Sequence, residues 1–168
     1  EAAGTYTARN VADDTAAPLA LVFLGDSSAC GLGATKPVET PGAQLALGIS
    51  AVAERPVRLH SVAAVGARSE HLDDQVSAAL CQQPRPNVAV ILIGVNDITH
   101  LRMPDAAAAL LAAALRRLRD AGAAAVVGTC PDLGMVQPIP QPLRSLAGLI
   151  GRQLAAAQTM AAVEAGAR

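Results

Sequence analysis

The sequence predicts an α/β fold in three layers, with a central parallel sheet between two layers of helices. The first observation is that four apolar runs of strand length alternate with three segments of helical character. The second is that each helical segment is long enough to return the chain across the sheet, so that successive strands run parallel. The third is the length of 168 residues, which is typical of one domain with its own core.

The predicted strands share one pattern, a short apolar run that ends at a glycine or a turn. The first run begins at Leu19 and stops abruptly at Gly25, as a buried parallel strand does where it becomes a loop. The other three strands are expected at residues 57–65, 88–93 and 123–128.

Three helices are expected between these strands, at residues 41–53, 69–80 and 104–120. The third has the most local support, because Pro104 suits a first helical turn and residues 106–109 are alanines, the best helix formers. Gly122 is suited to end this helix. An arginine cluster in its last turn is interpreted as a solvated helix end that complements the dipole, not as an anion site.

The two ends of the chain have a different character. Residues 1–18 are small and polar without an apolar period, and they are expected to form a flexible lead-in to a single domain over residues 19–168. Prolines follow Cys130 in quick succession, and a last helix is expected at about residues 143–160. The final residues, 162–168, are compatible with the opening of a further strand.

Charge and composition exclude several classes of function. The formal net charge is -1, so the chain lacks the positive field on which nucleic-acid binding depends. Phe23 and Tyr6 are the only aromatic residues, which removes the stacking surfaces for single-stranded nucleic acid. The apolar runs are too short and too interrupted for a membrane span. No nucleic-acid partner and no membrane span are therefore expected, and the oligomeric state stays open.

The three cysteines, Cys30, Cys81 and Cys130, lie far apart and form no C-x-x-C pair. They are interpreted as buried free thiols, with no metal site and no redox couple. An odd number of cysteines favours a reducing compartment such as the cytoplasm. Because the sequence begins at Glu1 and not at methionine, a lost signal or anchor would allow a location in the cell envelope.

Polar motifs follow three of the predicted strands. In parallel sheets, ligands bind beyond the carboxyl ends of the strands, so these positions are the first candidates for a site. A serine hydroxyl at such a turn, beside a helix N-terminus, is suited to nucleophilic attack and oxyanion stabilisation. The motifs are Gly25-Asp26-Ser27, a glycine turn at Gly66, and Gly94-Val95-Asn96-Asp97.

These motifs resemble the G-D-S, glycine and G-x-N-D blocks of the SGNH (GDSL-type) hydrolase family, from about Leu21 onward. The resemblance implies a flavodoxin-like three-layer fold and a serine esterase that forms an acyl-serine intermediate on a small-molecule ester substrate. It implies no cofactor and no metal. Ser27 would be the nucleophile, and the oxyanion would be bound by the N–H groups of Ser27 and Gly66 and by the amide of Asn96.

Four neighbours are expected to support these catalytic groups, namely Gly25, Asp26, Gly94 and Asp97. The two aspartates are interpreted as accepting backbone N–H bonds that tie the loops together. Each proposed catalytic residue also has a purely structural explanation. Ser27 is a favourable N-cap, Gly66 suits a turn with positive φ, and Asn96 can satisfy backbone groups of its own loop.

Two further features leave alternatives open. Ser28 stands beside Ser27, but the family pattern has its nucleophile directly after the aspartate, which favours Ser27. Gly31-Leu32-Gly33 resembles part of a phosphate-binding loop, although Lys36 stands where G-x-G-x-x-G requires glycine. The alternative function is therefore a non-catalytic, flavodoxin-like module that binds a phosphate-containing small molecule.

A serine nucleophile needs a base, which this family supplies from a late D-x-x-H block. No histidine follows Cys130, and the sequence contains only His60, His71 and His100. Asp97 and His100 have D-x-x-H spacing, but they overlap the G-x-N-D block and are interpreted as a decoy. The expectation is therefore that the C-terminal part of the fold, with the catalytic aspartate and histidine, is missing, and that residues 1–168 alone are inactive.

Overall fold

The computed structural model describes residues 3–12, 16–135, 138 and 140–168. Its centre is a five-stranded sheet with the order β1-β3-β2-β4-β5. Four strands are parallel, and the short β1 pairs antiparallel with β3 at one edge. The strands are β1 (Gly4–Tyr6), β2 (Leu19–Gly25), β3 (Val57–Ser61), β4 (Val88–Leu92) and β5 (Ala124–Gly128).

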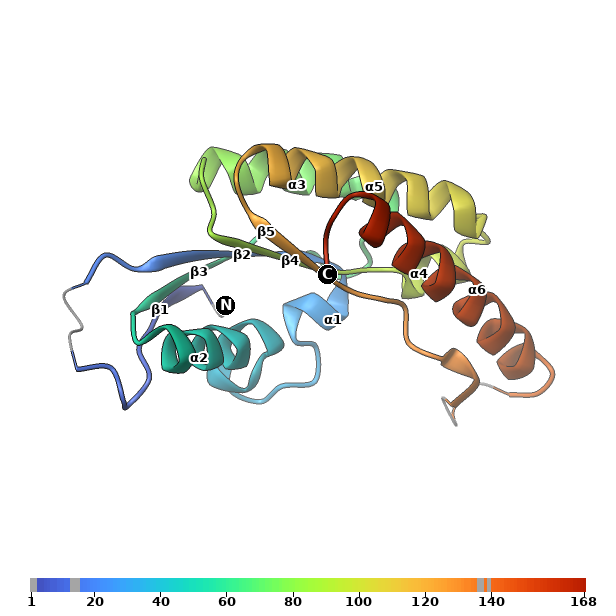
Figure 1. Ribbon diagram of the computed structural model, residues 1–168. Coiled ribbons are helices and arrows are strands. Elements are labelled where there is room, and N and C mark those ends of the chain that lie inside the picture. The colour runs from blue at the N-terminus through green and yellow to red at the C-terminus, as the bar shows by residue number, and fades with distance from the viewer. Residues whose placement is uncertain (1–2, 13–15, 136–137, 139) are drawn as a thin grey trace.

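Helices lie on both sides of the sheet, with α3, α5 and α6 on one face and α1 and α2 on the other (Figure 1). This arrangement confirms the predicted three-layer α/β fold. The helices are α1 (Ser27–Cys30), α2 (Pro41–Ala53), α3 (Leu72–Gln82), α4 (Val95–Thr99), α5 (Pro104–Asp120) and α6 (Leu143–Glu164), with short 3₁₀ turns η1 (Pro37–Glu39), η2 (Ser69–His71) and η3 (Leu133–Met135).

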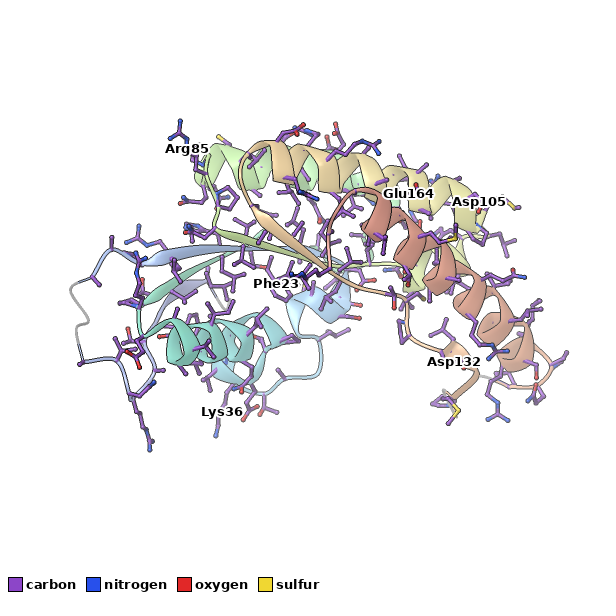
Figure 2. The ribbon with its side chains drawn as sticks, in the orientation of Figure 1. Phe23, Lys36, Arg85, Asp105, Asp132 and Glu164 are labelled. Carbon is purple, nitrogen blue, oxygen red and sulfur yellow. The ribbon has the colours of Figure 1, made fainter. Side chains whose placement is uncertain are left out.

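Strand β2 shows how the sequence divides the core between the two faces. Val22 and Leu24 point into the cluster formed with α3 and α5, whereas Leu21 and Phe23 point into the cluster between the sheet and α2. Figure 2 shows the ring of Phe23 in the interior, while labelled charged side chains such as Lys36 lie at the periphery. Burying each such apolar side chain contributes about 1.5–3 kcal/mol.

The two faces are not covered to the same extent. Beyond α2, an open groove of about 680 Å³ runs along β4 and β5, lined in part by Ile49, Val90 and Val126. The predicted coverage by helices is thus fulfilled on the α3/α5/α6 face and only in part on the other. In the described part of the chain, no helix combines the length and apolarity that crossing a bilayer requires.

Two of the expected helices have the observed bounds, and their ends explain why. Helix α2 begins with Pro41 after Thr40, whose hydroxyl accepts a bond from the N–H of Ala43 at 3.4 Å. Helix α5 begins with Pro104 and ends in a turn at Gly122, where φ is +93°. Local signals of this kind act within one turn, so sequence alone can locate them.

The N-terminal lead-in was expected to lack regular structure, yet Gly4–Tyr6 form strand β1 against β3. A three-residue strand has no pattern of its own, and its pairing partner defines it. Residues 1–2 and 13–15, which also belong to the expected lead-in, lie outside the described residues. The predicted strand over residues 57–65 is shorter than expected, because regular pairing ends at Ser61.

The C-terminal prediction also needs correction. Helix α6 continues to Glu164, so residues 162–164 are helical and do not open a strand. At Arg168, however, the backbone pairs with β5 as a parallel strand would. Its N–H donates to the carbonyl of Ala125 at 3.0 Å, and its carbonyl accepts from the N–H of Val127 at 2.7 Å.

Candidate active site

The three predicted motifs lie beyond the carboxyl ends of three adjacent strands. Strand β2 is hydrogen-bonded to β3 on one side and to β4 on the other. Ser27 begins α1 directly after β2, Gly66 lies in the loop after β3, and Asn96 lies in α4 after β4. The side-by-side strand ends that an oxyanion site requires are therefore present.

The turn before Ser27 accepts only glycine at position 25. Gly25 has a φ of +132°, and a Cβ there would lie 1.8 Å from the carbonyl oxygen of Leu92. The next residue, Asp26, donates its N–H to the same oxygen at 3.0 Å. Because β2 and β4 approach so closely here, the chain turns directly into α1, and Ser27 lies just beyond the carboxyl end of β2.

Asp26, and not Ser27, is the N-cap of α1. Its Oδ1 accepts the N–H of Ser28 at 2.9 Å. The structural explanation of Ser27 as a cap therefore does not apply. The Ser27 hydroxyl is half-buried, and no hydrogen bond to it is found among the described residues. As the first residue of a helix, Ser27 also has an N–H without an intrahelical partner.

A buried glutamine on α3 holds this turn, and sequence reasoning missed it. Gln75 Oε1 accepts the N–H of Gly25 at 2.8 Å, and Gln75 Nε2 donates to the Gly25 carbonyl at 2.9 Å. One side-chain amide thus satisfies both backbone groups of the residue that ends β2. The two residues are 50 positions apart in the chain, so no local motif connects them.

Asn96 is oriented by the loop that carries Gly66. Its Nδ2 donates one hydrogen bond to the carbonyl of Ala67 at 2.9 Å. An amide nitrogen carries two hydrogens, so one N–H of Asn96 remains available for a ligand. Gly66 itself is exposed, with a φ of +80° and open space where a Cβ would lie. Its glycine character is therefore required by the backbone angle and not by crowding.

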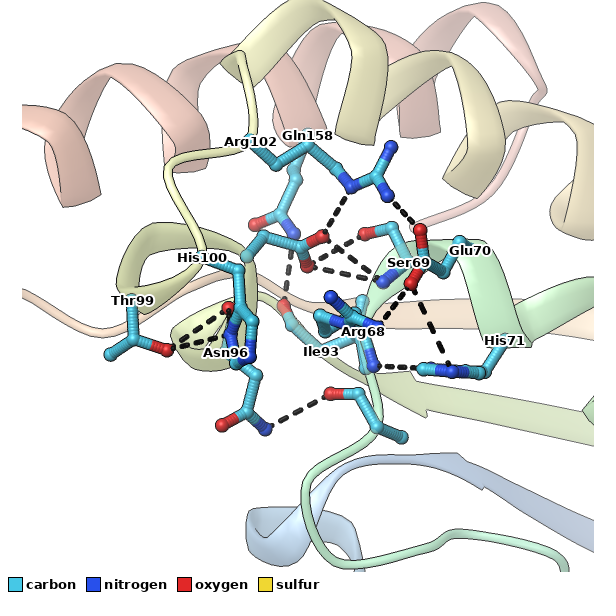
Figure 3. A network of polar contacts seen from close by, with 12 residues as sticks. Arg68, Ser69, Glu70, His71, Ile93, Asn96, Thr99, His100, Arg102 and Gln158 are labelled. Carbon is cyan, nitrogen blue, oxygen red and sulfur yellow. Dashed lines mark hydrogen bonds and ion pairs between the residues drawn. The ribbon is translucent and has the colours of Figure 1, made fainter.

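Asp97 connects the same two segments, the loop that carries Gly66 and helix α4. Its side chain is fully buried and accepts the N–H of Ser69 at 3.1 Å and the Ser69 hydroxyl at 2.9 Å. Arg102 forms an ion pair with Asp97 at 3.3 Å, measured from Nε to Oδ1, and a second ion pair with Glu70. Figure 3 shows this network between η2 and the segment after α4. These are the contacts of a structural support.

A second buried glutamine, Gln158 of α6, was also missed. Its Nε2 donates to the carbonyl of Ile93 at 2.9 Å, and its Oε1 accepts the N–H of Cys130 at 2.8 Å. It therefore ties the end of β4 to the loop after β5. Gly94 lies against the same group, because a Cβ there would be 2.9 Å from the Cβ of Cys130.

None of the three histidines contacts Ser27. His100 Nδ1 lies 2.8 Å from the backbone oxygen of Asn96, and His71 Nδ1 accepts the N–H of Arg68 at 2.9 Å. His60 lies in β3, with a buried Nε2 that has no partner. Asp97 does not orient His100 either, since its carboxylate contacts Ser69 and Arg102.

The nearby thiols are poor competitors for the role of nucleophile. Burial raises the pKa of Cys30, and the charge of Asp26 adds to this effect. Burial, with smaller effects from Asp26 and Asp97, raises the pKa of Cys130 to about 11. Both thiols are thus protonated near neutral pH, and a thiol attacks as its thiolate. All three cysteines are free, as predicted, but the predicted burial is wrong for two of them, because Cys30 is half-buried and Cys81 is exposed.

The alternative phosphate loop has structural explanations for its glycines. Gly31 ends α1 with a φ of +77°, and a Cβ there would lie 2.6 Å from Cγ2 of Thr40. Gly33 also has a positive φ, of +99°. Both glycines therefore serve turns between α1 and α2. Among the described residues, no group of three or more His, Cys, Asp or Glu side chains could hold a metal ion.

A pocket of about 270 Å³ opens beside the proposed nucleophile. It is bounded by the two residues that flank Ser27 in the chain, Asp26 and Ser28, and by Val95 at the start of α4. Thr129 and Pro131, in the loop after β5, form its other wall.

Residues 23–168 match the model of the GDSL-like lipase/acylhydrolase family. The GDSL-like esterase Rv1075c of Mycobacterium tuberculosis is 47% identical to this chain over 146 residues, which make up 87% of the chain. The same match covers 46% of that protein, so the chain spans about half the length of this curated relative.

Solved structures of low sequence identity share the fold. TesA has a TM-score of 0.71 at 19% identity, over 88% of this chain and 75% of its own. AlinE4, described as an esterase of the SGNH-hydrolase family, has a TM-score of 0.71 at 19% identity, over 90% of this chain and 75% of its own. Since the family model matches nearly the whole length, the chain belongs to the GDSL-like lipase/acylhydrolase family.

Proposed function

We propose that the protein hydrolyses carboxylic esters of small molecules through an acyl-serine intermediate, with Ser27 as the nucleophile. The observation that carries the proposal is the presence of three polar groups after three adjacent strands, in Ser27, Gly66 and Asn96. Membership of a family of lipases and acylhydrolases supports the same chemistry. The relative from Mycobacterium tuberculosis is itself named an esterase.

In the proposed reaction, the Ser27 oxygen bonds to the ester carbonyl carbon while its proton passes to a base. The carbonyl electron pair moves to oxygen, and the resulting oxyanion accepts bonds from the N–H groups of Ser27 and Gly66 and from the free amide N–H of Asn96. Collapse breaks the bond to the alcohol, which leaves with the proton from the base. Water then attacks the acyl-serine in the same way and releases the carboxylic acid.

Among the described residues, no hydrogen bond joins Ser27 to any of the three histidines. The Nδ1 contacts of His71 and His100 are with backbone atoms, and His60 is part of β3. We therefore propose that a group outside residues 1–168 accepts the proton. Residues 1–168 alone are then expected to release p-nitrophenol from p-nitrophenyl acetate only at the background rate.

The nucleophile is tested by two serine variants of the full-length gene product. Ser27→Ala is expected to reduce hydrolysis of p-nitrophenyl acetate to background and to leave thermal stability unchanged, because Asp26 provides the helix cap. Ser28→Ala is the matched control and is expected to retain turnover. If Ser28→Ala is the inactive variant and Ser27→Ala stays active, the assignment of the nucleophile is wrong.

The proposed origin of the base is tested separately. If residues 1–168 alone turn over the ester at the rate of the full-length gene product, and His100→Ala abolishes this activity, then His100 is the base. Loss of activity in the full-length product on substitution of a histidine outside residues 1–168, with His100→Ala still active, supports the proposal.

A further inference from the structure

We infer that Arg102 is a positioning residue for the two oxyanion donors supplied by Gly66 and Asn96. The inference rests on the proposed ester hydrolysis, because the donors have a role only in that reaction. Arg102 is not expected to touch substrate. It acts through the carboxylate of Asp97, which follows Asn96 in the chain.

The proposed role of Arg102 begins with the buried carboxylate of Asp97. The side chain is 0% exposed, and a buried carboxylate remains charged only where hydrogen bonds and an opposite charge compensate it. Ser69 supplies two hydrogen bonds, from its N–H and its hydroxyl. In the part of the chain that the structure describes, Arg102 is the cation within ion-pair distance of this carboxylate, at 3.3 Å.

Ser69 connects this ion pair to the donors. Ser69 lies three residues after Gly66, so its two bonds to Asp97 fix the Gly66 loop against α4. The bond from Asn96 Nδ2 to the Ala67 carbonyl is a further tie between the same loops. Figure 3 shows Arg102 on one side of this network and Asn96 on the other. Loosening the bonds of Asp97 therefore changes the separation of the two donors.

The backbone turns at Leu101 and so brings Arg102 back to Asp97. Leu101 has a φ of +54°, an unfavourable angle for a leucine, and its side chain is 81% exposed, so packing does not hold it. The constraint comes from its neighbour instead. The N–H of Arg102 donates to the backbone oxygen of Asp97 at 2.9 Å, and its guanidinium is held from outside by Glu70, which also pairs with Arg68.

The experiment compares Arg102→Met, Arg102→Lys and Arg117→Met in the full-length gene product, with p-nitrophenyl acetate as substrate. Arg117 is the control, because it forms an exposed ion pair with Asp73 between α5 and α3. Arg102→Met is expected to lower kcat by about tenfold to a hundredfold, with KM changed less than about twofold, since misplaced donors act on the transition state. Arg102→Lys should lie between Met and the parent, and Arg117→Met should equal the parent.

Thermal unfolding of each variant separates positioning from a general loss of stability, because kcat is compared at a temperature at which the variant is folded. In Arg102→Met, the buried carboxylate of Asp97 loses its compensating cation, so kcat should fall even where the variant is folded. If Arg102→Met is too unstable to assay, the same comparison is made with Arg102→Lys.

Amide NMR provides a readout that does not depend on catalysis. The N–H resonances of Ser69 and Gly66 should shift in Arg102→Met and stay in place in Arg117→Met. If these resonances shift while kcat stays at the parent value, the positioning role is refuted. If the resonances do not shift, the coupling of Arg102 to the loops is refuted as well. If the parent protein hydrolyses no ester, the proposed function fails, and the resonances alone decide whether Arg102 sets the loop geometry.

Discussion

The nucleophile turn, residues 25–28, and the oxyanion loops, residues 66–69 and 94–102, are held by different chemistry. In the turn, the neutral amide of Gln75 binds both backbone groups of Gly25. In the loops, the ties run through the charged side chains of Asp97, Arg102 and Glu70. The tie through Gln75 is therefore expected to depend less on the pH and salt concentration of the solution than the ties through Asp97, Arg102 and Glu70.

This difference has a physical consequence for the site. Amide hydrogen bonds do not depend on protonation or salt, whereas the strength of a carboxylate–guanidinium tie depends on both. Gly25 and Gly66 also differ in crowding, since a Cβ at Gly25 would meet backbone at 1.8 Å, whereas one at Gly66 would face open space. The end of β2 before the proposed nucleophile is thus held by a neutral amide, whereas the proposed oxyanion donors lie on loops held through charged side chains.

The largest expected effect comes from breaking the rigid turn. Gly25→Ala places a methyl group against the backbone of β4 at a φ of +132°, which neither strand can relieve by rotating a side chain. We expect a loss of more than about 4 kcal/mol in the free energy of unfolding, measured in urea. Gly33→Ala is the control, because Gly33 also has a positive φ but has nothing within 4 Å of a Cβ. Equal losses for both variants would show that crowding at Gly25 is unimportant.

The next effect is on the oxyanion side. Asn96→Ala in the full-length gene product is expected to lower kcat by roughly a hundredfold to a thousandfold, with little change in KM, because the donor acts mainly in the transition state. Asn87→Ala is the matched control, since Asn87 Oδ1 accepts the N–H of Ala20 at the opposite end of the sheet. It should lower stability and leave kcat unchanged. A raised KM at constant kcat for Asn96→Ala would mean that Asn96 binds substrate instead.

Gln75→Met tests whether the turn is held independently of pH. It leaves the buried N–H and carbonyl of Gly25 without partners, so we expect the free energy of unfolding to fall by about 2–4 kcal/mol. The fall should be the same at pH 5 and pH 8, because neither the side-chain amide nor the backbone groups it binds gain or lose a proton in this range. Gln82→Met, an exposed glutamine of the same helix, is the control. A loss for Gln75→Met that varies strongly with pH would contradict the division between neutral and charged ties.

The smallest effect concerns the second neutral tie, through Gln158. Because the pKa of Cys130 is about 11, its thiolate is scarce at pH 8, and alkylation by iodoacetamide should be much slower than at the exposed Cys81. Gln158→Met frees the backbone of Cys130 and should accelerate its alkylation by about threefold to tenfold. Gln153→Met, exposed on the same helix, should not. Peptide mass spectrometry gives both rates, and equal acceleration by the two variants would exclude this role of Gln158.

The elements that the sequence located correctly are those with local signals. Helix α5 has the predicted bounds because Pro104 starts it and Gly122 follows its end, and β2 follows from one apolar run. The three motif positions follow from the strand ends, and their proximity follows from the strand order. The short β1 and the full length of α6 depend on packing partners, and no pattern within either segment predicts them.

The supports of the site could not be predicted for the same reason. Gln75 and Gln158 act on backbone groups 50 and 65 positions away, and a glutamine in a helix carries no mark that distinguishes it from a solvated one. Arg102 looks like an ordinary loop arginine until the turn at Leu101 brings it onto Asp97. Sequence motifs identified the proposed catalytic groups, whereas the groups that hold them became visible only in three dimensions.

The central claim, that Ser27 is the nucleophile, is tested most directly by covalent labelling. The full-length gene product is treated with a fluorophosphonate, and fragment-ion mass spectrometry locates the adduct between the adjacent residues Ser27 and Ser28. We expect an adduct on Ser27 that persists in Ser28→Ala, forms more slowly in Asn96→Ala and is absent in Ser27→Ala. An adduct on Ser28, or labelling of Ser27→Ala at the parent rate, would show that Ser27 is not the nucleophile.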